Sequence, residues 1–249
     1  MGLGRLNGKR VIITGGARGM GATHAEFLAD EGAAVVIGDI LDEEGRETAA
    51  TLTGRGLNVR YEHLDVTDED SWHAVVDRTV ADLGGVDGLV NNAGVTGTPG
   101  GPEVEDLAAW NATLAVNQTG AYLGIRVVAP AMRAAGGGSI VNISSILGYI
   151  GDGVYFAYAA TKGALRLMSR SAALKFVDDS IRVNSVCPGM VRTPMNDAEV
   201  DADSYVTNTP MRRMADPVEV SRAVLFLLSD EASYVTGSDL VIDGGYLAR

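Results

Sequence analysis

The stretch Arg10-Val-Ile-Ile-Thr-Gly-Gly-Ala-Arg-Gly-Met-Gly21 decides the fold. Its first five residues form a β-branched run that predicts a short buried strand, and a helical pattern follows at 21–31. The glycines between them let the chain turn sharply, let the backbone approach a phosphate and let the helix pack against the strand. The first turn of the helix has unpaired amides, which favour a negative charge. The stretch therefore predicts a strand–turn–helix unit that binds a pyrophosphate.

The spacing of the glycines narrows the kind of nucleotide site. It is Gly-x-x-x-Gly-x-Gly, rather than the Gly-x-Gly-x-x-Gly of many dinucleotide enzymes. It also lacks the Lys-Ser/Thr pair of a nucleoside triphosphate loop. We expect the dinucleotide to contact Gly15, Arg18, Gly19, Met20 and Gly21.

The alternation of strand and helix continues along the chain. Short β-branched runs predict strands at 10–14, 33–38, 58–64, 86–90, 138–144, 181–186 and 238–242. Helical patterns lie between them, at 21–31, 42–52, 71–83, 107–135, 155–176 and 217–228. The strand runs are almost continuously apolar, which is typical of parallel strands covered on both faces. The prediction is a single α/β domain over residues 1–249, a Rossmann-type doubly wound parallel seven-stranded sheet with helices on both faces.

Composition argues against several classes of protein. The chain has 249 residues, 46% of them hydrophobic, which is enough for one domain with a sizeable core. Its 20 Lys and Arg against 32 Asp and Glu give a net charge of −12, which argues against nucleic acid or an anionic membrane as partner. A single cysteine, Cys187, excludes an internal disulfide, and no apolar run has the length of a signal peptide core or a membrane span. We therefore expect a cytoplasmic protein.

Asp39, at the end of the second predicted strand, indicates which dinucleotide is bound. A carboxylate there can accept hydrogen bonds from both adenosine ribose hydroxyls, and it would repel a 2′-phosphate. Arg18 argues the other way, because a guanidinium beside the turn could pair with that phosphate. However, Ile40 follows Asp39, so no second cation supports Arg18. The prediction is NAD (NADH) rather than NADP.

The ends of the next two strands carry further candidates for the dinucleotide site. Asp65 and Val66 are placed to meet the adenine edge, although a lone aspartate there could equally cap the following helix. The fourth strand ends in Asn91-Asn92-Ala93-Gly94. Amide and small side chains at that point could cross-link neighbouring strands and leave room for a cofactor, or could form an ordinary turn.

Tyr158 and Lys162 lie four residues apart in a predicted helix, so both side chains can point to the same face. A phenol is a weak acid near neutral pH, because its ordinary pKa is about 10. A neighbouring ammonium favours the phenolate and lowers that pKa toward the working range. The pair is therefore a candidate acid/base device, although an ordinary pair on a helix surface has the same spacing.

An ordered set of motifs makes the chain resemble the short-chain dehydrogenase/reductase family over essentially its whole length. The motifs are residues 14–21, Asp65-Val66, residues 91–94, Asn117, Ser145, Tyr158, Lys162 and Pro188-Gly189. The resemblance implies that Asn117 holds a water on a proton relay to Lys162, and that Ser145 hydrogen-bonds the substrate oxygen. It also implies that Tyr158 passes the proton, while Lys162 lowers the pKa of Tyr158 and binds the nicotinamide ribose.

The resemblance also implies contacts to the nicotinamide end of the cofactor and an oligomeric state. Pro188, Gly189, Val191 and Thr193 would seat the nicotinamide carboxamide, and Asn92, Ala93 and Gly94 would adjoin the cofactor. The resemblance implies a homotetramer, with the predicted helices 107–135 and 155–176 as the expected interfaces. A small-molecule substrate is the expected partner.

Residues 190–215 have little periodicity, and four of the eight methionines fall in this stretch, which predicts a lid over an apolar substrate. Ordinary packing of a loop onto the domain is an equal alternative. The expected substrate contacts are Ser145, Leu147, Tyr149, Tyr158, Met190 and Met195.

The hypothesis is an NAD(H)-dependent oxidoreductase interconverting a secondary alcohol and a ketone, with a hydroxysteroid or a similar apolar molecule as substrate. One alternative is a 3-oxoacyl-carrier-protein reductase, against which Asp39 and the net charge of −12 speak. Another is a catalytically silent nucleotide-sensing protein, which would need no proton relay. The three histidines are scattered over different elements, so we expect no metal site.

Overall fold

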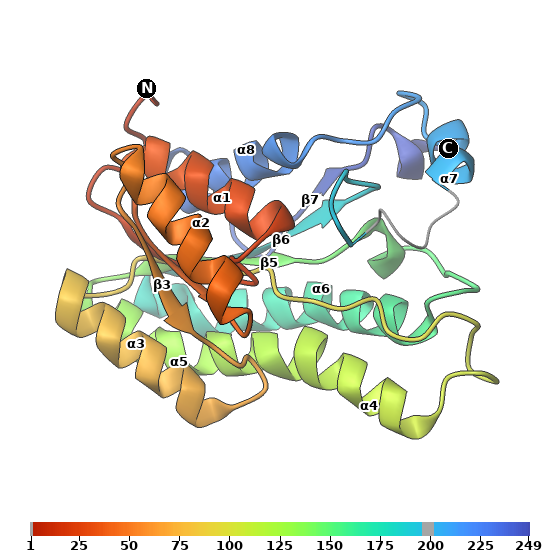
Figure 1. The fold of residues 1–249 in the computed structure, drawn as a ribbon, viewed down its shortest axis with the longest axis horizontal. Coiled ribbons are helices and arrows are strands. Elements are labelled where there is room, and N and C mark those ends of the chain that lie inside the picture. Colours follow the sequence, from red (N-terminus) through yellow and green to blue (C-terminus); the bar gives the residue numbers. More distant parts are fainter. Residues whose placement is uncertain (1, 196–201) are drawn as a thin grey trace.

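The computed structural model describes residues 2–195 and 202–249, and its centre is a seven-stranded parallel sheet (Figure 1). The strand order is β3-β2-β1-β4-β5-β6-β7. The bounds are β1 Arg10–Thr14, β2 Ala34–Asp39, β3 Val59–His63, β4 Gly88–Asn91, β5 Gly138–Ile143, β6 Ile181–Pro188 and β7 Asp239–Ile242. The predicted Rossmann-type sheet is thereby confirmed, with strand bounds that move by one or two residues.

Alternate side chains of the strands enter two separate apolar cores. Val11 and Ile13 of β1 pack on one face of the sheet, while Ile12 between them packs on the other. Both faces are covered by helices, so a strand buried on both sides needs apolar residues at every position. This explains why the strand runs in the sequence are continuous rather than alternating.

The helices form a layer on each face of the sheet (Figure 1). One layer holds α1 Gly19–Asp30, α2 Asp42–Gly54 and α8 Pro217–Leu228. The other holds α3 Glu69–Leu83, α4 Leu107–Leu114, α5 Gly120–Ala134 and α6 Phe156–Phe176. Short 3₁₀ turns occupy Ile146–Gly148, Val177–Asp179, Asp230–Ala232 and Tyr246–Ala248.

Two features of the helices differ from the sequence-based expectation. The helix predicted over 107–135 is interrupted by a π-helical segment, Ala115–Thr119, between α4 and α5. A further helix, α7 Ala202–Asn208, lies within residues 190–215, where no helix was predicted. No helix in the described part of the chain is long and apolar enough to cross a membrane.

The order of the strands locates the ligand crevice. β1 pairs with β2 on one side and with β4 on the other, so the chain changes direction across the sheet at β1. Ligands of doubly wound sheets bind outside the carboxyl ends of the strands at this switch point. The ends of β1, β4, β5 and β6 therefore define the region to inspect for a site.

Candidate active site

The glycine turn at the end of β1 has the conformation that its sequence requires. Gly15 and Gly19 have φ angles of 64° and 59°, where L side chains are strained. A Cβ atom on Gly21 would collide with the Gly15 carbonyl oxygen. α1 begins at Gly19, and its first-turn amides have no intrahelical partner. The turn therefore presents backbone donors at a helix N-terminus.

Asp39 ties the end of β2 to this turn. One carboxylate oxygen accepts a hydrogen bond from the Ala17 amide at 3.0 Å, and the other accepts one from the Leu41 amide at 3.1 Å. Ile40 is 61% exposed beside it. Arg18 is also exposed, and its side chain forms no hydrogen bond or ion pair within residues 2–195 and 202–249. The Asp39 carboxylate, and not the Arg18 guanidinium, is therefore the charged group that is held in place at the end of β2.

Asn92 cross-links the end of β4 to the end of β1. Its Nδ2 donates to the carbonyls of Thr14 and Gly15, and the Thr14 hydroxyl accepts from the amides of Asn92 and Ala93. The Oδ1 atom of Asn92 is buried and accepts no hydrogen bond from any described residue. Of the two interpretations of this strand end, the structure supports the cross-link.

Asp65 and Val66 make local contacts after β3. The Asp65 carboxylate accepts from both the amide and the hydroxyl of Thr67, which is the turn geometry of a residue ahead of a helix. Val66 is buried, and its side chain packs where a Cβ atom of Gly120 would lie. The N-cap of α3 is Asp68, whose side chain accepts from the Asp70 amide, so the capping alternative for Asp65 is wrong. The contacts of Asp65 and Val66 neither require nor prevent an adenine contact.

A crevice that is partly open to solvent lies at the carboxyl ends of β5 and β6. It brings together three of the predicted catalytic residues, Ser145, Tyr158 and Lys162. Seven predicted cofactor contacts also line it: Met20, Asn92, Gly94, Pro188, Gly189, Val191 and Thr193. Gly15, Arg18, Gly19, Gly21, Asp39 and Ile40 lie at or beside the neighbouring glycine turn, outside this lining.

Lys162 is 4% exposed, and its Nζ donates to the Ile143 carbonyl at 2.7 Å. The same Nζ lies 5.2 Å from the centre of the Tyr158 ring. Ser145 is also buried, at the start of the 3₁₀ turn after β5, where its Oγ accepts from the Leu147 amide. The two side chains of α6 therefore face the strand end that carries Ser145.

Burial shifts both α6 groups toward their neutral forms. Loss of water raises the pKa of Tyr158 to about 12, although a hydrogen bond with Ser145 acts in the opposite direction. Loss of water also lowers the pKa of Lys162 to about 8. The raised pKa of Tyr158 differs from the expected lowering, because loss of water outweighs the hydrogen bond with Ser145, and the Lys162 ammonium donates to the Ile143 carbonyl.

Asn117 lies in the π-helical segment and is almost fully buried. Its Oδ1 accepts from the Val95 amide, while its Nδ2 donates to the Val95 carbonyl and to the Thr161 hydroxyl. A Cβ atom on Gly94 would lie 3.3 Å from Asn117 Oδ1 and 3.6 Å from Lys162 Nζ. Because residue 94 is glycine, the space between these two atoms contains no side chain. π-helical segments often mark functional positions.

The predicted substrate contacts separate into two groups. Leu147, Met190 and Met195 line the crevice with Ser145 and Tyr158. Tyr149 does not line it, because its hydroxyl donates to Asp239 at 3.0 Å and its ring stacks under Arg166. Tyr149 comes only two residues after Leu147, yet it contacts Asp239 and Arg166 instead of the crevice, which sequence spacing alone does not reveal.

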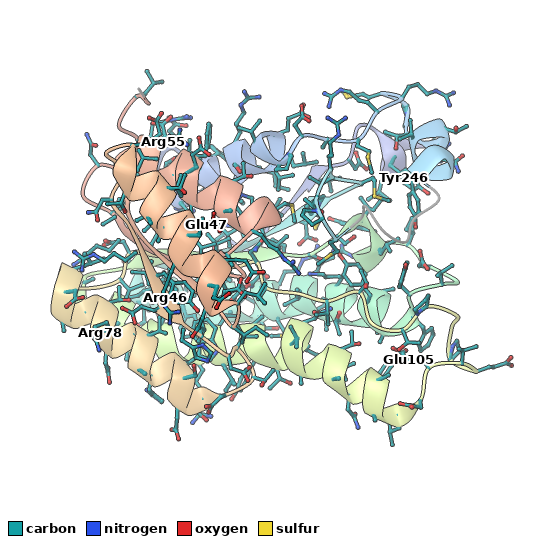
Figure 2. The ribbon with its side chains drawn as sticks, in the orientation of Figure 1. Arg46, Glu47, Arg55, Arg78, Glu105 and Tyr246 are labelled. Atoms are coloured by element: carbon teal, nitrogen blue, oxygen red, sulfur yellow. The ribbon has the colours of Figure 1, made fainter. Side chains whose placement is uncertain are left out.

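Sequence reasoning missed several residues of the crevice. Thr96, Ile146 and Tyr155 line it without having been proposed as contacts. Tyr205 of α7, which the sequence placed in the lid, lines the crevice as well, and its hydroxyl donates to Asp152 at 3.0 Å in the segment ahead of α6. Figure 2 labels Tyr246, whose ring stacks on that of Tyr205 at 6.2 Å. The position of Tyr155 three residues before Tyr158 was the signal from which its place in the crevice could have been predicted.

The cysteine and the histidines, which are the other side chains that could be reactive, are held by ordinary structural contacts. Cys187 is fully buried, and burial raises the pKa of its thiol to about 11. His24 is buried against the Ser221 hydroxyl, and His63 lies 2.7 Å from Asp42, a carboxylate partner that was not expected. Within the described residues, no group of three or more His, Cys, Asp or Glu side chains could hold a metal ion.

These observations fit a nicotinamide dinucleotide. The turn has the positive-φ glycines and the free helix N-terminus that a pyrophosphate needs. The unpartnered Asn92 Oδ1 and the side-chain-free position at Gly94 adjoin the crevice that contains Tyr158 and Lys162. A Rossmann-type sheet with such a turn and a tyrosine–lysine pair that lines the adjoining crevice defines a class, the nicotinamide-dependent oxidoreductases.

The chain belongs to the short-chain dehydrogenase/reductase family. A family model described as enoyl-(acyl carrier protein) reductase matches residues 15–247. A 3-alpha-(or 20-beta)-hydroxysteroid dehydrogenase from Mycobacterium bovis is 50% identical, over 98% of this chain and 92% of the relative.

Two further relatives act on small rings, by their names. A cyclopentanol dehydrogenase from Comamonas sp. is 45% identical, over 99% of this chain and 100% of the relative. A 2,5-dichloro-2,5-cyclohexadiene-1,4-diol dehydrogenase from Sphingobium indicum is 44% identical, over 97% of each chain. With this membership and these relatives, the protein is a short-chain alcohol dehydrogenase or ketoreductase.

Proposed function

We propose that the protein is an NAD(H)-dependent oxidoreductase that interconverts a secondary alcohol and a ketone on a compact apolar ring. The observation that carries the proposal is the crevice, in which Ser145, Tyr158 and Lys162 share one space with residues beside the glycine turn. A hydroxysteroid is one substrate of this kind, and a monocyclic alcohol is another. The relatives named for a hydroxysteroid, a cyclopentanol and a cyclohexadiene-diol all support a ring alcohol.

Tyr158 is the proposed proton donor and acceptor for the substrate oxygen. Ser145 Oγ donates a hydrogen bond to the same oxygen and stabilises the charge that develops on it. Lys162 supplies positive charge beside the phenol when it is protonated, which opposes the effect of burial on the Tyr158 pKa. Asn117 holds a water that connects Lys162 to solvent, in the space left open at Gly94.

The cofactor residues follow from the glycine turn and from the edges of the crevice. The backbone of Gly15, Gly19, Met20 and Gly21 holds the pyrophosphate, and Asp39 accepts hydrogen bonds from the adenosine ribose. Asp65, Val66, Ala93 and Gly94 flank the adenine and ribose, and Pro188, Gly189, Val191 and Thr193 hold the carboxamide. A bound nicotinamide supplies or accepts the hydride. The negative charge of Asp39 favours NAD over NADP.

We extend the proposal to the organisation of the whole chain. Residues 1–249 form one NAD-binding domain, with residues 190–215 as a substrate lid. Residues 196–201 of this lid lie outside the described residues, and the Tyr205–Asp152 hydrogen bond joins α7 to the segment ahead of α6. The chain assembles as a homotetramer through α4, α5 and α6, where Leu107, Leu167 and Leu174 are 64% to 81% exposed. The protein is cytoplasmic, consistent with its single buried free cysteine.

A panel of ketones and secondary alcohols tests the proposal. Cyclic ketones, steroid ketones and a 3-oxoacyl thioester are assayed with NADH and NADPH in parallel, by absorbance of the reduced nicotinamide. Turnover of cyclic ketones with a preference for NADH is expected. Turnover confined to the thioester with NADPH would favour an acyl-carrier-protein reductase. NADH binding without any turnover would favour a nucleotide sensor.

A further inference from the structure

The 3₁₀ turn Ile146–Gly148, which directly follows Ser145, is fixed to α6 by contacts to its backbone. The Ser144 hydroxyl donates to the Lys162 carbonyl at 2.7 Å, and Lys162 Nζ donates to the Ile143 carbonyl at 2.7 Å. A Cβ atom on Gly148 would lie 2.7 Å from the Lys162 carbonyl oxygen, so the turn packs backbone to backbone on the helix. The position of Ser145 relative to α6 therefore depends on how this turn is held.

Arg166 holds the far end of the same turn. It follows Lys162 by four residues, so it continues the face of α6 that carries Tyr158 and Lys162. Its Nη1 donates to the Gly148 carbonyl at 2.5 Å, and its guanidinium lies 3.2 Å from the centre of the Tyr149 ring. The side chain is only 17% exposed. A planar guanidinium can donate and stack at the same time, which a lysine ammonium cannot do.

Asp239, at the first position of β7, completes the cluster. Its Oδ2 accepts from Arg166 Nε at 3.0 Å, from the Tyr149 hydroxyl at 3.0 Å and from Arg170 Nη2 at 2.7 Å. Its side chain is 3% exposed, and its Oδ1 is buried without a hydrogen bond from any described residue. A buried ion pair of this kind adds little net stability but can fix one geometry.

We infer that Arg166 is a positioning residue which, with Tyr149 and Asp239, sets the Ser145-bearing turn against the helix that carries Tyr158 and Lys162. The inference rests on the proposed function, because it assigns Ser145 and Tyr158 to one substrate oxygen. The Ile146–Gly148 turn joins Ser145 to Tyr149 along the chain, and its Leu147 amide donates to Ser145 Oγ, so a shift at Tyr149 is expected to change the orientation of that hydroxyl. A misplacement of about 1 Å in a reacting group costs about a hundredfold in rate.

The contacts also explain why the cluster is separate from coenzyme binding. Arg166, Tyr149 and Asp239 do not line the crevice, and none of them contacts the glycine turn. Their loss is therefore expected to lower kcat while the affinity for NADH stays unchanged. A general loss of stability would instead lower both.

Arg170 provides a matched control on the same helix. It donates to the same Asp239 oxygen as Arg166, but no hydrogen bond joins it to the Ile146–Gly148 turn or to Tyr149. Arg166→Met should lower kcat for a cyclic ketone by about tenfold to a hundredfold with the NADH dissociation constant unchanged. Arg170→Met should leave both constants near the wild-type values. Arg166→Lys should recover only part of the loss, because it restores a charge without the stacked fork.

Hydrogen exchange gives a second measurement that needs no turnover. The amides of Leu147, Gly148 and Tyr149 donate to Ser145 Oγ, Ser145 O and Ile146 O, so they report directly on the turn. Their exchange should be faster in Arg166→Met, and in the milder Tyr149→Phe, than in Arg170→Met. Equal exchange and equal kcat in the two arginine variants would overturn the inference. Wild-type protein that binds NADH but reduces no ketone would refute the proposed function, while the exchange rates would still decide the role of Arg166 in holding the turn.

Discussion

The two sides of the crevice are built in different ways. On the coenzyme side, at the ends of β1, β2 and β4, the functional groups are backbone amides, and short-range turns and strand-end side chains hold them. On the chemistry side, at the end of β5 and on α6, the functional groups are side chains of Ser145, Tyr158 and Lys162. These depend on contacts between segments far apart in the chain, such as Arg166 with Asp239.

This difference in construction determines how each side of the crevice responds to a substitution. A binding site made of backbone amides loses its geometry when a side chain enters it, because a strained turn no longer points its amides at the pyrophosphate. A set of catalytic side chains fails when one partner is displaced or neutralised, while the surrounding backbone stays intact. Substitutions on the coenzyme side should therefore change binding, and substitutions on the chemistry side should change turnover.

Apart from Tyr158→Phe, which is described last, the largest expected effect comes from Gly21→Ala on the coenzyme side. The new Cβ atom collides with the Gly15 carbonyl oxygen, so the turn must open. We expect the NADH dissociation constant to rise by at least about a hundredfold, since two or more amide contacts are lost. Gly54→Ala, at the end of α2, is the control, because its Cβ atom meets nothing within 4 Å. Fluorescence titration with NADH gives the dissociation constants of both variants. Equal constants would contradict the proposal that the glycine turn holds the pyrophosphate with its backbone amides.

The second effect concerns His24 on α1, which is buried and neutral. Loss of water lowers its pKa from 6.5 to about 3, so below pH 6.5 the unfolded chain binds a proton that the folded chain does not. Stability is therefore lost as the pH falls from 6.5 toward 3. Between pH 7 and pH 5 the loss from this group is roughly 2 kcal/mol. The free energy of unfolding of His24→Gln, measured with urea, should fall less steeply below pH 6.5 than that of the wild type. An equal fall in the two proteins would refute the assignment of His24 as buried and neutral.

A smaller effect is expected for Asp39→Ala. Removing the carboxylate removes the repulsion toward a 2′-phosphate and the hydrogen bond to the Ala17 amide. The ratio of kcat/KM with NADH to that with NADPH should fall by about tenfold. Asp42→Asn is the control, because Asp42 is held by Tyr61 and His63 instead of the turn. An unchanged ratio in Asp39→Ala would remove the basis for NAD selectivity.

The smallest effect is expected for Tyr205→Phe, on the chemistry side. The substitution keeps the ring that stacks on Tyr246 but removes the hydrogen bond to Asp152. One neutral-to-charged hydrogen bond contributes about 1.5–3 kcal/mol at most, and solvent at the crevice mouth reduces this. KM for the ketone should rise a few-fold while kcat and NADH binding stay constant. A change in kcat alone would place Tyr205 outside the lid function.

The coenzyme side could be predicted closely from the sequence. The glycine turn and the positions of the seven strands depend on local signals, which are short-range turns and continuous apolar runs. The cross-link from Asn92 to Thr14 was one of two alternatives, because an amide after a strand has the same sequence in a simple turn.

The chemistry side was predicted less completely. The spacing of Tyr158 and Lys162 placed them on one face, but the burial that raises the Tyr158 pKa depends on the whole crevice. The π-helical segment around Asn117 adds one residue to a helical turn, and no propensity signals it. The orientation of Tyr149 toward Asp239 joins residues ninety positions apart, which periodicity cannot detect.

Tyr158→Phe tests the central claim most directly. The variant keeps the ring beside Lys162 and removes only the hydroxyl that would exchange the proton. With a cyclic ketone and NADH, kcat should fall by at least about a thousandfold, while the NADH dissociation constant stays at the wild-type value. Turnover retained within about tenfold of wild type would contradict the assignment of Tyr158 as the proton donor.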